Sequence, residues 1–202
     1  MVEAFLKEQH ARYNLGHVPF QAYLDRFIEL DDHGYAEKQM VFRVLIGEFS
    51  VPATTGELVA DFRRNAWKNC RMFPGALDVL RQLRRRGYKL GIITNGSVES
   101  QAAKLHESGL ARLVDVALIS ERERIRKPDP RIFDRAAESL GVRAEECVFV
   151  GDNPEADVVG SLSAGMTAIW VEGSLSWPEN LTTVPTHTVR SLTELLALEF
   201  SE

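Results

Sequence analysis

Two acidic side chains follow a short apolar segment near residue 150. The segment 147–150 leads into Gly151 and Asp152, and a second carboxylate, Asp157, lies five residues further along at the expected start of a helix. In open α/β sheets, ligands bind beyond the carboxyl ends of the strands. Mg²⁺ prefers oxygen ligands and is usually held by one or two carboxylates together with substrate phosphate. The spacing therefore predicts a magnesium site formed by Asp152 and Asp157.

Two other polar side chains follow apolar segments earlier in the chain. Thr94 ends the expected strand 89–94, and the turn Asn95-Gly96 comes next. A hydroxyl and the backbone N–H groups of such a turn can bind phosphate oxygens. Lys127 lies in a loop before an expected helix, where a fixed ammonium can neutralise an anionic nucleophile or a phosphoryl group. Each feature alone is common in turns and caps, but their order predicts one crevice with a hydroxyl, a cation and two carboxylates.

The first third of the chain is expected to be helical. Apolar residues recur at the spacing of amphipathic helices from residue 1 to about residue 70. The expected helices begin near Phe5, Phe20, Met40 and Leu58, and the loops between them are short. Short loops between amphipathic helices favour a small antiparallel bundle. Residues 1–70 are therefore predicted to form a separate helical domain.

From residue 71 onward, helix and strand patterns alternate. The expected strands are 89–94, 114–119, 147–150 and 168–171, and the expected helices are 76–86, 98–107, 131–140, 154–164 and 192–198. Between the last strand and the last helix, 173–185 has the composition of a long loop. Strands that alternate with helices of this length indicate a parallel sheet with right-handed crossovers. The predicted fold class is α/β, with a Rossmann-like parallel sheet in residues 71–202.

The composition is typical of an ordinary globular protein. The 202 residues are 45% hydrophobic and 26% charged, with a formal net charge of -5 that argues against nucleic acid as a partner. No apolar run is long enough to span a membrane, and the N-terminal residues lack a signal-peptide pattern. The two cysteines, Cys70 and Cys147, are expected to be reduced and buried. We therefore expect a cytoplasmic protein without membrane or nucleic-acid partners.

Together these motifs resemble the haloacid dehalogenase-like (HAD-like) hydrolase superfamily, in its branch with a helical cap (C1-type). The residues that carry the resemblance are Ile93–Gly96, Lys127–Pro130 with Ile132-Phe133, Gly151–Asp157, and the flanking Gln101, Lys104-Leu105, Gly109-Leu110 and Ala164–Met166. The resemblance covers nearly the whole chain. It implies that residues 1–70 are a mobile cap that closes over the substrate, and that residues 71–202 are the HAD-like core.

The resemblance also implies a role for each motif. Thr94 and the turn that follows it would bind the transferring phosphoryl group, and Lys127 would steady the nucleophile and the phosphate. Asp152 would ligate Mg²⁺, and Asp157 would support the metal directly or through water. The activity implied is a Mg²⁺-dependent phosphatase that hydrolyses a small phosphorylated metabolite through an aspartyl-phosphate. Substrate identity and oligomeric state remain open.

The chain departs from the family at its first motif, an Asp-x-Asp that follows a strand and precedes the cap. In the family the first of these aspartates attacks phosphorus and the second acts as general acid and base. No two aspartates of this chain are separated by one residue, and the nearest candidate, Asp31-Asp32, lies in the expected helical domain. We therefore expect the chain to be truncated ahead of Met1 and to be inactive as printed.

The expected loss of that strand has a structural consequence. In the family this strand lies between two others, which correspond here to the strand that ends at Thr94 and the strand that precedes Asp152. Without it, each of these two strands would have an unpaired edge. Unsatisfied buried amides cost about 1–3 kcal/mol each, and exposed strand edges promote aggregation. The printed chain is therefore predicted to be marginally stable or poorly soluble.

Three other functions are compatible with parts of the pattern. A pseudoenzyme or phosphate-binding module would keep the pocket without a nucleophile. A haloacid dehalogenase needs no metal, and its last motif usually lacks the second aspartate, so Asp152 and Asp157 favour phosphate chemistry. A two-component receiver domain has its acidic residues ahead of the threonine, and the order here rejects it.

In the helical domain, His17, Tyr23 and Arg43 are candidates for substrate contact.

Overall fold

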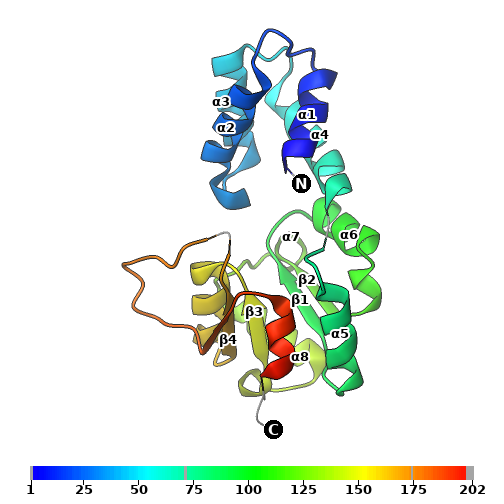
Figure 1. Cartoon of the computed structure of the whole chain (residues 1–202), viewed down its shortest axis with the longest axis vertical. Coiled ribbons are helices and arrows are strands. Elements are labelled where there is room, and N and C mark those ends of the chain that lie inside the picture. Colours follow the sequence, from blue (N-terminus) through cyan, green and yellow to red (C-terminus); the bar gives the residue numbers. More distant parts are fainter. Residues whose placement is uncertain (1, 71, 174, 199–202) are drawn as a thin grey trace. The chain divides into compact units, whose positions relative to one another are not determined.

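The computed structural model describes residues 2–70, 72–173 and 175–198, and the chain divides into two compact units, Met1–Arg71 and Met72–Glu202 (Figure 1). The first unit contains α1 (Val2–Arg12), α2 (Phe20–Asp31), η1 (Asp32–Gly34), α3 (Lys38–Phe49), α4 (Thr55–Asn65) and η2 (Ala66–Asn69). The four helices expected from apolar spacing are therefore present. No helix in the described ranges is long and apolar enough to cross a membrane.

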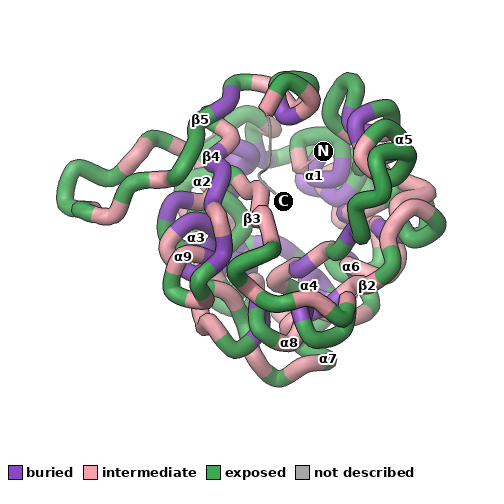
Figure 2. The backbone as a smooth tube through the Cα atoms, turned by 90° about the horizontal axis from the view of Figure 1, so that it is seen from below, coloured by how far each residue is buried: buried purple, intermediate pink, exposed green. Residues whose placement is uncertain are grey.

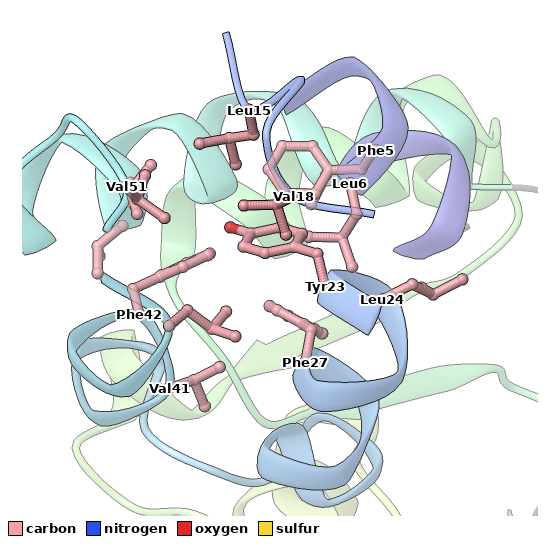
Figure 3. Packing of buried hydrophobic residues seen from close by; sticks show 14 residues of the cluster. Phe5, Leu6, Leu15, Val18, Tyr23, Leu24, Phe27, Val41, Phe42 and Val51 are labelled. Atoms are coloured by element: carbon pink, nitrogen blue, oxygen red, sulfur yellow. The ribbon is translucent and has the colours of Figure 1, made fainter. Parts of the chain in front are cut away.

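The helices of the first unit pack around an aromatic core. Phe5 of α1, Phe27 of α2 and Phe42 of α3 are fully buried, and Figure 3 shows their rings directed into the space between the helices. The start of α4 is fixed by a capping box, because Thr54 accepts a hydrogen bond from the Glu57 N–H while the Glu57 carboxylate accepts one from the Thr54 N–H. The apolar periodicity of the helices thus explains the core of this unit, and the capping box explains where α4 begins.

The second unit alternates helices and short strands. Its elements are α5 (Ala76–Arg85), β1 (Gly91–Thr94), α6 (Val98–Glu107), η3 (Leu110–Arg112), β2 (Val116–Ile119), α7 (Ser120–Glu123), α8 (Pro130–Leu140), η4 (Ala144–Glu146), β3 (Val148–Gly151), the π-helix η5 (Pro154–Val159), α9 (Gly160–Ser163), β4 (Thr167–Val171), β5 (His187–Val189) and η6 (Leu192–Ala197). Every expected strand and helix is present. Sequence periodicity did not indicate β5, because three residues are too few to show an alternation, nor the four-residue α7.

The described strands form two parallel sheets. One joins β1 to β2, with Ile93 opposite Leu118, and the other has the order β3-β4-β5, with Val150 opposite Ile169. This arrangement confirms the α/β class. Within the described ranges, β1 pairs with β2 alone and β3 with β4 alone, so each of these two strands has one unpaired edge, as the sequence predicted.

Helices cover both faces of the second sheet, following the alternation of side chains along a strand. Val148 and Val150 of β3 pack on one face in a cluster with residues of α5 and η6, whereas Phe149 points to the other face and α8. Phe133 of α8 contacts the Phe149 ring at 4.9 Å between centroids and belongs to the same cluster as Ile93 of β1. The helix α8 is therefore a common support for β1 and β3, which are not hydrogen-bonded to each other among the described strands.

Apolar residues next to the two unpaired edges are incompletely covered. Every residue of β3 is half-buried, whereas the middle of β4 is buried (Figure 2). Ile92 of β1 is also half-buried. The apolar side of α5 shows the same pattern, because Val79 is buried but Leu77 and Leu80 are only half-buried. The apolar residues of β1, β3 and α5 are thus less completely covered than the centre of β4.

The cysteines differ from the expectation in one respect. Cys70 is exposed rather than buried, because it follows η2 at the end of the first unit. Cys147 is half-buried, its thiol donates to the Arg143 carbonyl at 3.3 Å, and desolvation together with Glu146 raises its pKa. Both thiols are free.

Candidate active site

The turn after β3 places its two carboxylates in different environments. Asn153 caps η5, since its side-chain oxygen accepts a hydrogen bond from the Ala156 N–H at 2.6 Å. This directs Asp157 inward, where it is 3% exposed and its Oδ2 accepts a hydrogen bond from the Asn153 N–H at 3.0 Å. Asp152 is exposed, and its backbone carbonyl accepts a hydrogen bond from the Trp170 indole at 3.0 Å. The Asp152 side chain thus lies at the surface, whereas the Asp157 carboxylate stabilises the turn.

Gly151 is required by the close approach of Asp157. A Cβ atom on Gly151 would lie 2.4 Å from both Cβ and Cγ of Asp157. We expect Gly151→Ala to displace Asp157 and to lower the free energy of unfolding by about 1–3 kcal/mol, the usual cost of overpacking. Urea unfolding measures this, with Gly173→Ala as the control, because a Cβ there meets nothing within 4 Å. Equal effects of the two variants would contradict the tight packing.

Lys127 forms a buried ion pair with Asp157. The distance from Lys127 Nζ to Asp157 Oδ1 is 2.6 Å, and the two side chains are 11% and 5% exposed. The ammonium also lies 5.4 Å from the centroid of the Phe149 ring, within cation–π range. Asp129 caps α8 just beyond, and its hydrogen bonds to Arg131 lower its pKa to about 2. The lysine side chain is therefore held in place by Phe149 of β3 and Asp157 of η5.

Thr94 and Gly96 at the end of β1 are bonded to neighbouring elements. The Thr94 hydroxyl donates to Gln101 Oε1 at 3.0 Å, and the Gly96 N–H donates to the Ser120 hydroxyl at 3.0 Å. Gly96 has a φ of +142° and lies against Gln101, whose Nε2 would be 2.6 Å from an added Cβ. The two donors proposed for phosphate thus have protein partners, which a bound anion would have to replace.

Asn95 connects the end of β1 to the lysine loop. Its side-chain Nδ2 donates to the Lys127 carbonyl at 3.0 Å, and its Oδ1 accepts a hydrogen bond from the Lys127 N–H at 3.0 Å. Direct contacts therefore join Asn95, Lys127 and Asp157 into one group. The sequence identified Gln101 only as part of the family resemblance and did not indicate Ser120 or Trp170, because the roles of these partners depend on contacts between elements.

The carboxylates near β3 supply few metal ligands. Among the described residues, no group of three or more His, Cys, Asp or Glu side chains could enclose a metal ion. Both oxygens of Asp157 already accept hydrogen bonds, one from Lys127 and one from Asn153. The exposed carboxylate of Asp152 is a hard oxygen donor at the carboxyl end of a strand. This set fits an ion such as Mg²⁺ that retains water and takes substrate oxygens, and it does not fit a metal enclosed by protein ligands.

Tyr23 does not line a substrate site, contrary to the expectation from sequence. It is fully buried among the apolar side chains of Figure 3, and its hydroxyl donates to Gln9 Oε1 at 3.1 Å. Gln9 in turn donates to Asp61, and burial raises the pKa of Tyr23. Arg43 is exposed, and His17 contacts the Phe49 carbonyl at 3.1 Å. Tyr23 is therefore a core residue of the first unit.

Comparison with known proteins decides the family. Residues 4–165 match the model of the haloacid dehalogenase-like hydrolases. The chain belongs to this family. Three similar proteins are a Thermus thermophilus phosphoserine phosphatase (38% identity, 80% of this chain, 65% of that protein), a Methanopyrus kandleri glyceraldehyde 3-phosphate phosphatase (35%, 61%, 53%) and a Burkholderia cepacia (S)-2-haloacid dehalogenase (34%, 66%, 58%). The chain thus spans less than two thirds of the length of each.

A solved structure agrees with this membership. The Bacillus subtilis HAD hydrolase YfnB, crystallised with magnesium, is 25% identical and has a TM-score of 0.78 over 97% of this chain and 90% of its own length. The resemblance first indicated by Thr94, Lys127 and Asp152 is therefore confirmed at the level of family and fold.

Proposed function

We propose that this HAD-like chain provides the phosphate-binding and magnesium-binding part of a phosphatase for small phosphorylated metabolites in the cytoplasm. The observation that carries the proposal is the Lys127 ammonium, fixed between Asp157 and Phe149 beside the end of β1. A buried cation held in this way gives electrostatic stabilisation to a phosphoryl group at no cost of reorganisation. The phosphatases among the relatives support the same chemistry. We further propose that the helical unit Met1–Arg71 acts as the cap.

Each site residue has a separate task in this proposal. The Lys127 ammonium neutralises charge on the phosphoryl oxygens, and the Thr94 hydroxyl turns from Gln101 to donate to one of them. Asp152 holds Mg²⁺, which when bound neutralises phosphate charge and orients the substrate. Asp157 keeps Lys127 in position. The turn N–H groups at Asn95-Gly96 would donate to the same oxygens, and the Gly96 N–H would turn from the Ser120 hydroxyl to do so.

The attacking carboxylate is not among these residues. The sequence contains no Asp-x-Asp, and Asp31 of the first unit is paired with Lys38 at 2.7 Å. We propose that turnover requires a strand that carries this motif and pairs with the unpaired edges of β1 and β3. One aspartate would then attack phosphorus as the bond to the leaving alcohol breaks, and the other would protonate the alcohol. Without that strand the printed chain binds phosphate but does not turn over.

A phosphomonoester panel tests this function. Phosphate release is measured with and without Mg²⁺ for the printed chain and for the chain with an added apolar strand followed by Asp-x-Asp. Mg²⁺-dependent release by the second protein alone is the expected result. Equal turnover by both proteins would overturn the proposal of a missing nucleophile. Release of chloride from a 2-chloroacid without Mg²⁺, and no phosphate release, would favour the dehalogenase activity of the Burkholderia relative.

The role of Asp152 can be tested on the printed chain. We expect Asp152→Asn to weaken Mg²⁺ binding at least tenfold, because even outer-shell partners of a metal change its affinity by about 10–100-fold. Isothermal titration with Mg²⁺ in the presence of inorganic phosphate measures the dissociation constant. Asp134→Asn, which changes another exposed aspartate, on α8, is the control and should leave Mg²⁺ binding unchanged. Unchanged binding in Asp152→Asn would remove this residue from the site.

A further inference from the structure

The side chain of Asn95 binds the main chain of Lys127 in both directions. One hydrogen bond runs from Asn95 Nδ2 to the Lys127 carbonyl and the other from the Lys127 N–H to Asn95 Oδ1, each at 3.0 Å. The two residues are separated by 32 positions in the sequence, and both hydrogen bonds are partly buried. A primary amide that bonds to both the N–H and the carbonyl of one residue fixes the backbone position of that residue, since the two groups belong to consecutive peptides. Asn95 therefore holds Lys127 by its backbone.

This contact continues to the end of β3. The Lys127 ammonium donates to Asp157 Oδ1 at 2.6 Å, and Asp157 Oδ2 accepts a hydrogen bond from the Asn153 N–H at 3.0 Å. Among the described strands, β1 and β3 are not hydrogen-bonded to each other. The series Asn95, Lys127, Asp157 and Asn153 is thus a polar connection between the ends of two separate sheets.

The Asn95 amide uses its oxygen and one of its two Nδ2–H donors to hold Lys127. A phosphate oxygen that took the Nδ2 donor away from the Lys127 carbonyl would weaken the contact that positions the lysine. We propose that the Asn95 side chain is a positioning residue that acts on phosphate through Lys127 and does not itself bind the phosphate. This inference rests on the proposed function, and it assigns the side chain a different role from the backbone N–H groups of the same turn.

A positioning role couples the effect of Asn95 on phosphate binding to the presence of the Lys127 ammonium. If Asn95 acts through the lysine, its removal has little effect once the ammonium is gone. If Asn95 binds phosphate directly, its removal costs the same in either background. Residues in one hydrogen-bond network show such non-additivity, whereas independent contributions add. A general loss of stability would also persist in both backgrounds, so the cycle separates positioning from a merely structural role.

The test is a double-mutant cycle on inorganic phosphate binding, measured by isothermal titration with Mg²⁺ present. The parent chain and Lys127→Met/Asp157→Asn, which removes the ion pair without leaving a lone buried charge, are each combined with Asn95→Ala. We expect Asn95→Ala to weaken phosphate binding about tenfold in the parent and less than about twofold in the second background. Amide exchange of the Lys127 N–H should accelerate in Asn95→Ala. Asn180→Ala, an exposed asparagine in the loop after β4, is the control and should change neither quantity.

The outcomes distinguish this inference from the proposed function. An equal loss of phosphate affinity from Asn95→Ala in both backgrounds would overturn the positioning role. If Lys127→Met/Asp157→Asn weakens phosphate binding but Asn95→Ala does not, the positioning role is overturned and the proposed function stands. No phosphate binding by the parent chain, or no effect of removing the lysine, would overturn both. Asn95→Ser, which cannot form the reciprocal pair, repeats the cycle if Asn95→Ala does not fold, and the same additive result would count against the inference.

Discussion

Replacement of Asp157 by Asn is expected to lower the free energy of unfolding by about 3–5 kcal/mol, the largest stability effect in the second unit. The substitution keeps the shape of the side chain and removes its charge, so the Lys127 ammonium stays buried without a counter-ion. Its side chain is only 11% exposed, and the ring of Phe149 covers another side. Breaking a buried pair by removing one partner has a cost of this size because the remaining charge cannot regain its hydration.

The same reasoning predicts the behaviour of the other variants of this pair. Lys127→Met leaves the Asp157 carboxylate with the Asn153 N–H as its described partner and should be similarly destabilised. The combination Lys127→Met/Asp157→Asn leaves no buried charge and should be more stable than either single variant. Urea unfolding provides all three values. Glu172→Gln is the control, since its pair with Arg190 is 46% and 84% exposed and should contribute at most about 0.5 kcal/mol. A combination that is less stable than both single variants would show that the charges stabilise the fold.

Much of this architecture could be predicted from the sequence, because the signals involved are local. Short apolar runs located β1 and β3, and the polar residues at or just after their ends located Thr94 and Asp152. Parallel strands end at one edge of a sheet, so the two ends could be expected to lie near each other. The unpaired edges also followed from the absence of a motif that can be recognised in a single sequence.

What could not be predicted depends on contacts between distant residues. The spacing of 32 residues between Asn95 and Lys127 gives no indication that a side-chain amide of one binds the backbone of the other. Likewise, both Asp152 and Asp157 are acidic residues after a strand, and only the packing of Asp157 against Gly151 shows that it is buried and paired. Tyr23 was misassigned because an aromatic residue with a hydroxyl suits both a core and a substrate site.

The other large effect is expected when the chain is supplied with an apolar strand that ends in Asp-x-Asp. Pairing with β1 and β3 would satisfy the edge amides of Gly91–Thr94 and Val148–Gly151 and cover the half-buried residues beside them. Amide exchange at these two segments should slow, and the midpoint of urea unfolding should rise. Slower exchange at β2 or β5 alone would show that the strand binds elsewhere.

The chemical effect of that strand can be separated from its structural effect. A matched strand ending in Asn-x-Asn should bury the same surface and raise the unfolding midpoint equally, but it cannot form an aspartyl-phosphate. We therefore expect at least a thousandfold difference in Mg²⁺-dependent phosphate release between the two strands, because loss of a nucleophile costs up to about 10⁶ in turnover. Equal release from both would mean that the carboxylates of this chain already suffice. Equal stabilisation with turnover from Asp-x-Asp alone would mean that β1 and β3 position the nucleophile, next to the phosphate that we propose Lys127 and Asp152 act on.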